Sequence, residues 1–534
     1  MIFGITLGIE AIIYALAWYL FQPAVNLESA GFWGMVIFGL ALIMFAAIFS
    51  AESVDFCEKI AAISGVLAGI ALVLLILIAL FNTPLFRANS YAKLYGKENI
   101  ETVDISEYFA RLDNIPLTDS DTANKLAIRK MGSLKGDMVS QFEAADSYVS
   151  TYNGVSYRIA PLKYAGFSQW LSNKESGIPA YITVNMTTQE TEIVYLEKEM
   201  KYSPSEYFSR DLLRHIRKDF PSSILGDSVF EIDEDGMPYW ITPVIDHTIG
   251  LFSGDTVKGV VVTNAISGEN EYYKVDNVPE WIDNVYPTDM LISQYDSYGK
   301  YQDGFWNSVF AKKNAVATTE GYNYIPDSMD VNIYTGVTSL VTDESNVGFV
   351  LINKRTKQTY YYEYPGAEEF SAMSSAEGLV QQYGYTATFP LLVNVENEPT
   401  YYLALKDAGG LVKAYALINV RDYQNAVSAS TLEETVDKYL VMMGKKSSTS
   451  TIPSHEETEE IEKSFTVEVN GIIESIKTGD IDGNTYFYIK LSDSDVRYRI
   501  ALKYSESIML LDVGSTISLI AENSSEEIIS AKIN

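Results

Sequence analysis

The sequence predicts an α+β protein with three transmembrane helices at its N-terminus, repeated units of antiparallel sheet plus helix, and a small C-terminal β-barrel. Three observations lead to this prediction: apolar runs confined to the first 86 residues, strand–turn–strand segments that recur along the middle of the chain, and five short strand patterns near its end. At 534 residues the chain is also too long for a single hydrophobic core.

Three apolar segments predict membrane-spanning helices over residues 2–21, 31–49 and 61–81, within a transmembrane region of residues 1–86. Each is about 20 residues long, which at about 1.5 Å per residue crosses a hydrocarbon core of about 30 Å. None has the regularly spaced polar residues of a soluble amphipathic helix. The first segment could instead be a cleavable signal peptide, but it lacks a basic start and two further spans follow it.

Three residues inside these spans are candidates for a functional or packing role. Glu10 is ionisable, and such a residue faces a partner or a cavity unless it lies near the interface and extends outward. Gly65 and Gly69 form a small-xxx-small pattern that lets two helix backbones approach closely and offers a route to homo-oligomers. Glycine is also simply common in membrane helices, so both interpretations stay open.

The sequence gives only a weak signal for the side of the membrane on which the soluble region lies. Arg87, Lys93 and Lys97 follow the third span and only Lys59 lies between the second and third, which favours a cytoplasmic soluble region. Long domains, however, cross membranes largely regardless of charge. The tail is rich in Tyr, Asn, Ser and Thr and has no cysteine, as is typical of exported bacterial domains. We therefore expect a multi-pass cell-membrane protein with an extracytoplasmic soluble region, and keep the cytoplasm as the alternative.

Composition excludes several classes of function. The formal net charge of −31 repels phosphate backbones, so nucleic acid is not expected as a partner. Cys57 is the single cysteine, which rules out a disulfide within the chain and Cys₂ or Cys₄ metal sites. Three histidines leave little material for acid–base catalysis.

Residues 155–443 contain a degenerate repeat, preceded over residues 87–150 by what we expect to be a linker and a helical section. In each copy an apolar strand ends in asparagine, and a turn and a tyrosine-bearing strand follow, which is the pattern of a β-hairpin. These asparagines are Asn185, Asn264, Asn353 and, in a looser fourth copy, Asn419.

An upstream strand of this repeat recurs as Tyr157-Arg-Ile-Ala-Pro161 and Tyr239-Trp-Ile-Thr-Pro243, with similar alternation in Tyr401-Tyr-Leu-Ala-Leu405. Helices are expected after the hairpins, over residues 203–218, 287–298 and 430–443. Ser203-Pro204-Ser-Glu206 has the pattern of a capping box with proline at the first helical position. Each unit is therefore expected to pack helices on one face of an antiparallel sheet.

The strand–turn–strand segments around Asn185, Asn264 and Asn353 resemble the PepSY-type domain, a small helix-plus-sheet module of membrane-anchored bacterial proteins. The fuller run, with Gly177-Ile-Pro-Ala-Tyr181 and Phe305-Trp306-Asn307, resembles an uncharacterised membrane protein family of Gram-positive bacteria. PepSY-type domains are associated with peptidase inhibition or regulation at the cell envelope. The resemblance implies that role by analogy of fold and not of site.

Residues 445–463 form an acidic, Ser- and Thr-rich linker, and residues 464–534 predict a separate all-β unit. Five strands in about 70 residues match an OB-like barrel. The expected strands cover residues 465–476, 485–491, 496–502, 516–521 and 528–533. Because acidic residues outnumber basic ones there, a protein- or glycan-facing role fits better than nucleic acid.

No catalytic, cofactor-binding or metal-ligating set is predicted. His247 follows a strand and could pair with Asp246, but a histidine at a strand end is usually a satisfied polar residue, and His455 lies in the linker. Glu231-Ile-Asp233-Glu-Asp235-Gly236 resembles the start of a calcium loop, yet Thr242 stands where the closing glutamate belongs, so a hairpin turn is favoured. Asp480-Ile-Asp482-Gly483 invites the same conclusion.

One basic face stands out in this acidic chain. Residues Arg210, Arg214, Arg217 and Lys218, together with His215, lie on one predicted helix. Such a face could bind an anionic partner such as a lipid headgroup or a wall polymer, or it could be a solvated surface that pairs with nearby carboxylates.

Three functional hypotheses follow from these observations. The first is a membrane-anchored, non-enzymatic scaffold or binding protein of the cell envelope, with a protein or envelope polymer as partner. The second is a regulator or inhibitor of a membrane or secreted peptidase through PepSY-like modules. The third is a hydrolase that uses two carboxylates, which would need paired acids in a deep cleft.

Overall fold

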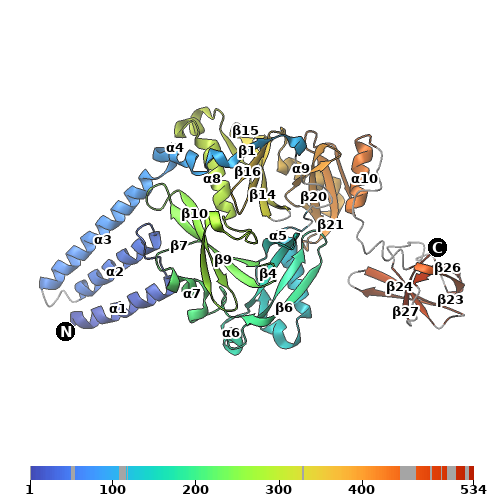
Figure 1. The fold of residues 1–534 in the computed structure, drawn as a ribbon, viewed down its shortest axis with the longest axis horizontal. Coiled ribbons are helices and arrows are strands. Elements are labelled where there is room, and N and C mark those ends of the chain that lie inside the picture. Colours follow the sequence, from blue (N-terminus) through green and yellow to red (C-terminus); the bar gives the residue numbers. More distant parts are fainter. Residues whose placement is uncertain are drawn as a thin grey trace. The chain divides into compact units, whose positions relative to one another are not determined.

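The computed structural model describes residues 2–49, 55–107, 116, 118–327 and 330–445, and in the C-terminal part 465–481, 484–492, 494, 496–501, 511, 513–522 and 528–533. The chain divides into two compact units, Met1–Ser447 and Ser448–Asn534. The first unit holds the apolar helices and a large mixed α+β region, and the second holds strands alone among its described residues (Figure 1).

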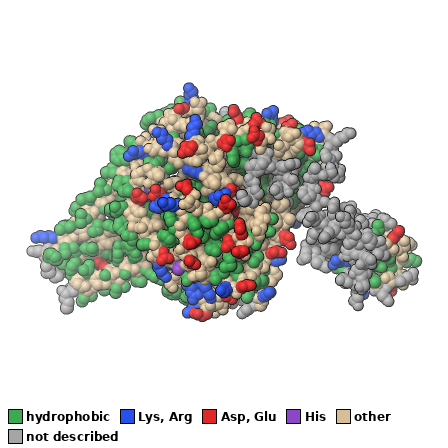
Figure 2. All heavy atoms as spheres, viewed as in Figure 1, with side chains coloured by type: hydrophobic (Ala, Val, Ile, Leu, Met, Phe, Trp, Pro, Cys, Tyr) green, Lys and Arg blue, Asp and Glu red, His purple; other side chains and the backbone are tan. Residues whose placement is uncertain are grey.

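Three N-terminal helices are long and apolar enough to cross a membrane, as predicted. They are α1 (Ile2–Phe21), α2 (Ala30–Phe49) and α3 (Asp55–Phe81), so the third begins six residues before the expected start at residue 61. The Tyr14 ring on α1 stacks on Phe38 of α2, with ring centroids 6.4 Å apart. Apolar side chains cover these helices, whereas charged side chains are scattered over the α+β region (Figure 2).

The α+β region contains four antiparallel sheets with the same strand order. In each sheet two short strands pair with one long strand, which pairs with a second long strand and then with a final strand. Sheet 1 contains β2 (Phe142–Ala144), β3 (Tyr148–Tyr152), β4 (Val155–Tyr164), β5 (Ile178–Asn185) and β6 (Thr191–Met200). Sheet 2 contains β7 (Ile224–Leu225), β8 (Val229–Ile232), β9 (Pro238–His247), β10 (Asp255–Asn264) and β11 (Asn270–Lys274).

The remaining two sheets follow the same plan. Sheet 3 contains β12 (Val316–Thr318), β13 (Asn323–Asp327), β14 (Asp330–Ser339), β15 (Thr342–Asn353) and β16 (Thr359–Tyr362). Two further strands join it: β1 (Ile100–Val103) pairs in parallel with β16, and β17 (Gly366–Ala367) pairs with β15. Sheet 4 contains β18 (Thr386–Ala387), β19 (Leu391–Val395), β20 (Glu398–Lys406), β21 (Val412–Asn419) and β22 (Ala426–Ala429).

A helix precedes each sheet in the chain, and each helix with its sheet is one repeat. Repeats 1 to 4 begin with α5 (Ser120–Lys130), α7 (Leu212–Asp219), α8 (Thr288–Tyr301) and α9 (Glu369–Leu379). Further helices are α4 (Pro84–Leu94), α6 (Phe167–Asn173) and α10 (Leu432–Met442). Short 3-10 turns cover Lys97–Asn99, Ile105–Glu107, Met131–Ser133, Gly136–Ser140, Phe208–Arg210, Val275–Asn277 and Gln381–Tyr383, and a π turn covers Asn307–Ala311.

Two expectations about this region differ from the structure. Repeat 1 starts at Ser120, so much of the section expected as linker and helix over 87–150 belongs to the repeats, and β1 in that section joins sheet 3. The helix expected from 203 begins only at Leu212, where Asp211 caps it by accepting from the Arg214 amide. Ser203 instead forms an isolated parallel bridge with Asp211.

The turn asparagines have one structural role in all four repeats. The Asn185 Oδ1 accepts hydrogen bonds from the amides of the second and third residues after it, each at 2.9 Å. The same pair of bonds is made by Asn264, Asn353 and Asn419. This side-chain acceptor replaces backbone partners at the tip of the hairpin, which explains why the sequence repeats asparagine at this point.

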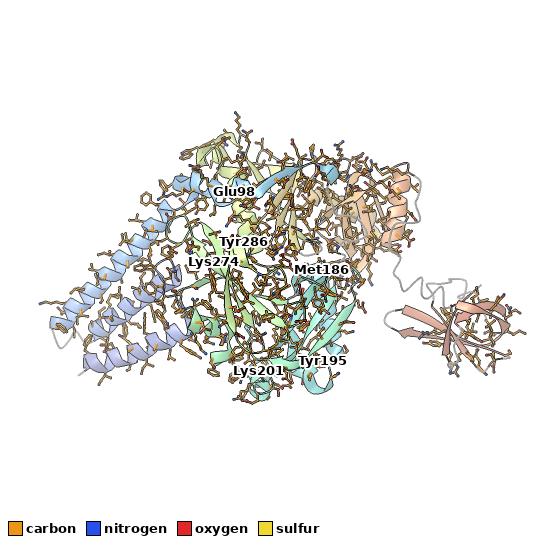
Figure 3. All side chains as sticks on the ribbon, viewed as in Figure 1. Glu98, Met186, Tyr195, Lys201, Lys274 and Tyr286 are labelled. Carbon is orange, nitrogen blue, oxygen red and sulfur yellow. The ribbon has the colours of Figure 1, made fainter. Side chains whose placement is uncertain are left out.

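Sheets 1 to 3 pack against one another through shared cores, and ring contacts join sheet 4 to sheet 3. Sheets 1 and 2 share one buried cluster, and sheets 2 and 3 share a second. Val149, Met186 and Val331 join repeats 1 and 3, and Met186 lies in the interior of the region (Figure 3). Lys406 of repeat 4 contacts Asp119 at 2.6 Å, next to α5 of repeat 1. We refer to residues 120–442, packed in this way, as the repeat body.

The repeat body contacts the ends of the apolar helices directly. In the loop between α1 and α2, the Val25 amide donates to Pro221 O at 2.8 Å. Just after α3, the Asn82 Nδ2 donates to Leu251 O at 2.9 Å. Both contacts involve repeat 2, so that repeat is the part of the body that meets the helices.

The C-terminal unit is a small barrel. Its strands are β23 (Phe465–Ile481), β24 (Asn484–Leu491), β25 (Arg497–Ala501), β26 (Thr516–Glu522) and β27 (Ile528–Ile533), close to the five predicted. They pair in the order β23-β24-β25-β27-β26, and β26 pairs back with β23. Ile489, Ile500 and Leu519 are fully buried in its core. Nearly all of the linker expected over 445–463, and the acidic Asp482-Gly483 turn, lie outside the described residues.

Candidate functional site

A cavity of about 730 Å³ lies where the four repeats meet, and we call it the junction cavity. Its volume is in the range of small-molecule sites. The described lining consists of Asp119, Ser120, Asp121, Ser147, Tyr148, Val149, Arg158, Gly226, Asp227, Val229, Pro243, Ile245, Asp255, Asn284, Tyr286, Pro287, Thr288, Met290, Tyr322, Asn323, Tyr324, Lys354 and Phe389. Five aromatic rings and several aliphatic side chains therefore share the lining with eleven polar or charged side chains, four of them aspartates.

Arg158 on β4 is the most unusual residue of the lining. It is 4% exposed, and its Nε has no hydrogen-bond partner among the described residues. No carboxylate of the described chain forms an ion pair with it; its guanidinium lies 5.7 Å from the centre of the Tyr324 ring. Burial lowers the pKa of Arg158, but a guanidinium stays protonated at neutral pH. The cavity therefore contains a buried positive charge that forms no ion pair with a described residue, although the Asp119 charge acts on it from a greater distance.

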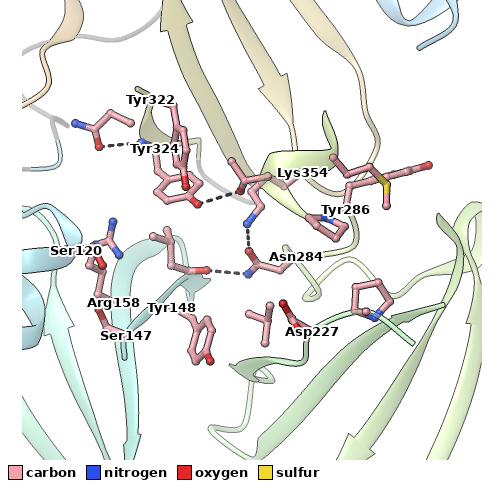
Figure 4. Close-up of a pocket in the computed structure, with 18 of the residues that line it drawn as sticks. Ser120, Ser147, Tyr148, Arg158, Asp227, Asn284, Tyr286, Tyr322, Tyr324 and Lys354 are labelled. Atoms are coloured by element: carbon pink, nitrogen blue, oxygen red, sulfur yellow. Dashed lines mark hydrogen bonds between the residues drawn. The ribbon is translucent and has the colours of Figure 1, made fainter. Parts of the chain in front are cut away.

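Lys354, just after β15, is the second cation of the cavity. It is 6% exposed, its Nζ donates to Asn284 Oδ1, and it lies 5.1 Å from the centre of the Tyr324 ring. The Tyr324 ring thus lies near both cations (Figure 4). Burial alone would raise the pKa of Tyr324, but Lys354 and Arg158, with hydrogen bonds to neighbouring hydroxyls, hold it below its ordinary value.

Two buried acids lie behind Asn284, outside the lining. Glu231 accepts hydrogen bonds from the Asp283 amide at 3.0 Å and from the Asn284 amide at 2.8 Å. Burial raises the pKa of Glu231 to about 7, and burial together with the Glu231 charge raises that of Asp283. The Asp283 Oδ1 has no partner among the described residues. Burial disfavours the charge on both acids, and the nearby Lys354 charge partly offsets this effect.

Three of the four carboxylates that line the cavity contact a basic side chain. Asp119 binds Lys406 at 2.6 Å, and Asp121 binds Lys125 at 2.8 Å. Asp255 contacts His247 Nδ1 at 2.8 Å. Asp227 is exposed at the cavity, and none of these acids contacts Arg158 directly. The described residues contain no cluster of three His, Cys, Asp or Glu side chains suited to a metal ion.

The basic residues singled out from the sequence lie around α7, where all four donate to backbone carbonyls. Arg210 donates to Lys174 O, and Arg217 donates to Ser223 O. Arg214 donates to Tyr19 O of α1 at 3.4 Å and lies 4.6 Å from the Tyr19 ring centre. Lys218 is exposed. The structure thus gives Arg214 a contact with the apolar helices, whereas the exposed Lys218 donates to Ser209 O at 3.4 Å.

The intramembrane candidates lie in different surroundings. Glu10 is 6% exposed on α1, and its Oε2 has no partner among the described residues. It lines an apolar hollow of about 480 Å³ between α1 and α2. A Cβ on Gly65 would lie 2.9 Å from Met44 Sδ of α2, whereas Gly69 faces open space. Gly65 therefore allows close packing within this chain, and Gly69 alone is available to another helix.

The histidine and acidic-loop candidates are placed as follows. His247 pairs with Asp255 rather than with Asp246, which instead contacts Lys258 at 3.3 Å. His215 contacts Gly268 O. Asp233 accepts from two amides of the β8–β9 turn, so the segment that resembles a calcium loop forms a hairpin turn, as favoured from the sequence.

Sequence reasoning did not select Arg158 or Lys354. In an alternating strand a charged residue normally points to solvent, so neither side chain gave a signal when considered alone. The signal was present in the repeat, because Tyr157-Arg-Ile-Ala-Pro161 aligns Arg158 with Trp240 of Tyr239-Trp-Ile-Thr-Pro243.

Comparison with known proteins adds little. No protein-family model and no curated protein matches the chain. Among solved structures, a mutant of Trypanosoma rangeli sialidase displaying trans-sialidase activity is matched with a TM-score of 0.16 and 11% identity. That match covers 73% of this chain and 53% of the sialidase, so the chain spans about half of that protein's length. A TM-score this low carries no argument about fold or function.

Proposed function

We propose that this protein is a membrane-anchored, non-enzymatic binding protein of the cell envelope. The observation that carries the proposal is the junction cavity, which all four repeats line. Its size suits a small ligand, and its polar groups converge from separate repeats onto one apolar space. The described lining contains no histidine or cysteine, so it offers no Ser-His or Cys-His pair for covalent catalysis.

The proposed topology follows from the contacts of repeat 2. Val25 in the first loop and Asn82 after α3 both bind this repeat, so both helix ends belong on the side of the repeat body. The start of α1, the end of α2 and the start of α3 then belong on the opposite side. We favour the extracytoplasmic side for the body, because it is acidic and without cysteine beyond residue 57.

A second candidate function is regulation of a peptidase. The shared strand order of the four sheets supports it, because each repeat combines a helix with an antiparallel sheet, as PepSY-type domains do. An adaptor role for the barrel is part of this candidate: the pairing order, with β25 parallel to β27, supports the proposal of an OB-like barrel. In this account the barrel contacts a protein or glycan while the repeat body holds a ligand.

Equilibrium dialysis against a small-molecule extract of the cell envelope tests the proposal. The full chain, purified in detergent, should enrich at least one component on its side of the membrane without changing the component's mass. A protein-dependent product of new mass would contradict the proposal and indicate an enzyme. The absence of any enrichment would contradict binding of envelope small molecules.

A further inference from the structure

We propose that the junction cavity binds a small organic monoanion, with a carboxylate held by Arg158 and Lys354 and an aromatic or apolar body packed against the tyrosines. This inference rests on the proposed binding function and names its ligand class. We compare Arg158 and Lys354 with the residues at the equivalent positions of the other repeats.

Arg158 occupies a position that is apolar or aromatic in the other three repeats. In each repeat it is the residue after the one that pairs with the turn asparagine. Those pairs are Tyr157–Asn185, Tyr239–Asn264, Asn332–Asn353 and Thr400–Asn419. The residues equivalent to Arg158 are therefore Trp240, Ile333 and Tyr401, at most 4% exposed. The repeat fold does not need an arginine here.

Lys354 occupies a second position of this kind. It directly follows the turn asparagine, and its amide donates to Val331 O at 3.0 Å. The equivalent residues, whose amides make the corresponding bond, are Met186, Ala265 and Val420. All three are buried and apolar. Two core positions of the repeat thus carry cations, and both cations border the same cavity.

A buried charge without a counter-ion is costly, so its presence at a core position needs a reason. No acid of the lining forms an ion pair with Arg158 among the described residues: Asp119 and Asp121 bind lysines, Asp255 contacts His247, and Asp227 is exposed. A bound carboxylate would supply it and would form charge-assisted hydrogen bonds with the guanidinium. The buried Ser147 Oγ, which has no partner among the described residues, is a further donor in the lining.

The rest of the lining selects the body of the ligand. Tyr148, Tyr286, Tyr322 and Phe389 offer ring faces and edges, and Ile245 and Met290 offer aliphatic surface. Such walls favour an apolar or aromatic group over a bare inorganic anion. The nearby carboxylates also disfavour a multiply charged ligand. A monocarboxylate with an aromatic or apolar body therefore fits better than phosphate.

The first test needs no ligand and compares two identical substitutions. Arg158→Met removes an unpartnered buried charge and should raise the melting temperature of the full chain by about 2–4 °C. Arg355→Met is the matched control, because Arg355 binds Asp330 with two contacts of 2.6 and 2.9 Å; it should lower the melting temperature. A decrease for Arg158→Met would make Arg158 a structural residue and overturn the proposal.

The second test measures binding. N-acetyl-L-phenylalanine and 3-phenylpropionate should raise the melting temperature of the wild-type chain, whereas their amides and inorganic phosphate should not. Arg158→Met should weaken binding of the acids at least about tenfold, and Arg355→Met should leave it unchanged. If the acids and their amides raised the melting temperature equally, the ligand would not need to be an anion, but the proposed binding function would still hold. A shift by phosphate alone, or none by either acid, would overturn the carboxylate assignment.

Discussion

Arg158 and Trp240 occupy the same position in two copies of one repeat, and both are buried. Trp240 packs among apolar residues and donates its indole N–H to Tyr202 O at 3.0 Å. Arg158 instead borders the junction cavity, where its Nε has no partner among the described residues. The repeat fold does not require a cation at this buried position, because the equivalent residues are apolar or aromatic. The proposed ligand site explains why repeat 1 has one.

Replacing Glu369 should alter the pH dependence of stability. This residue opens α9, is fully buried and accepts from Asn346 Nδ2 at 3.0 Å; burial raises its pKa to about 7. The pKa of Glu369 is higher in the folded chain than its value of about 4.5 in the unfolded chain. The stability that this difference contributes is fully present below about pH 4.5 and is lost as the pH rises through about 7. Each such group changes the free energy of unfolding by at most about 1.4 kcal/mol per pH unit.

Glu369→Gln should therefore reduce the loss of stability between about pH 5 and about pH 8, measured by thermal unfolding of the full chain. Glu231 and Asp283 also have raised pKa values, so part of the pH dependence should remain. Glu433→Gln, on an exposed face of α10, is the control and should change little. An unchanged pH profile in Glu369→Gln would contradict this assignment.

The hairpin turns allow a test with opposite signs in two repeats. Gln189 and Gly268 both lie four residues after the turn asparagine, with φ of 63° and 76°. A side chain in this left-handed region is strained, so Gln189→Gly should stabilise the chain by about 0.5–1 kcal/mol. Gly268→Ala should destabilise it, because a Cβ there would clash with the Tyr202 ring. Urea denaturation of both variants checks the pair, and equal signs would contradict the shared turn geometry.

Arg214 should control how firmly repeat 2 holds the loop between α1 and α2. Its contacts with Tyr19 support the neighbouring Val25 amide, which binds Pro221 O. Arg214→Ala should lower the hydrogen-exchange protection of residues 22–29 by up to about tenfold. Lys218→Ala, on the same helix but exposed, should not. Equal protection in both variants would show that Arg214 does not contribute to the contact.

The proposed topology can be checked by protease shaving of intact cells or protoplasts. Peptides from the repeat body and the barrel should be released before lysis if the body is extracytoplasmic. A cysteine at the exposed Leu27, in a chain without Cys57, should react with an impermeant maleimide under the same conditions. Protection of both until lysis would place the body in the cytoplasm and make Arg87, Lys93 and Lys97 the effective topology signal.

Much of the fold could be predicted from the sequence, because its signals are local. Apolar runs mark the helices, and asparagine marks the turns because its side chain caps them. The start of α7 at Leu212 could not be predicted, because Ser203-Pro204 has the pattern of a cap while Ser203 pairs with Asp211. The pairing of β1 with β16 joins residues about 260 positions apart and leaves no periodic pattern.

The candidate site was harder to predict than the fold. A cavity formed between four repeats depends on how the sheets pack, and no single segment contains that information. Only a comparison between repeats would have separated Arg158 and Lys354 from ordinary surface cations, by showing Trp240 and Ala265 at the same positions.

A double-mutant cycle on Arg158 and Lys354 tests the central claim most directly. The dissociation constant of N-acetyl-L-phenylalanine would be measured for the wild-type chain, Arg158→Met, Lys354→Met and the double variant. If both cations hold one carboxylate, each single substitution should weaken binding and the double variant should lose less than the sum of the two free-energy changes. Additive losses, or no loss in either single variant, would contradict a shared anion site.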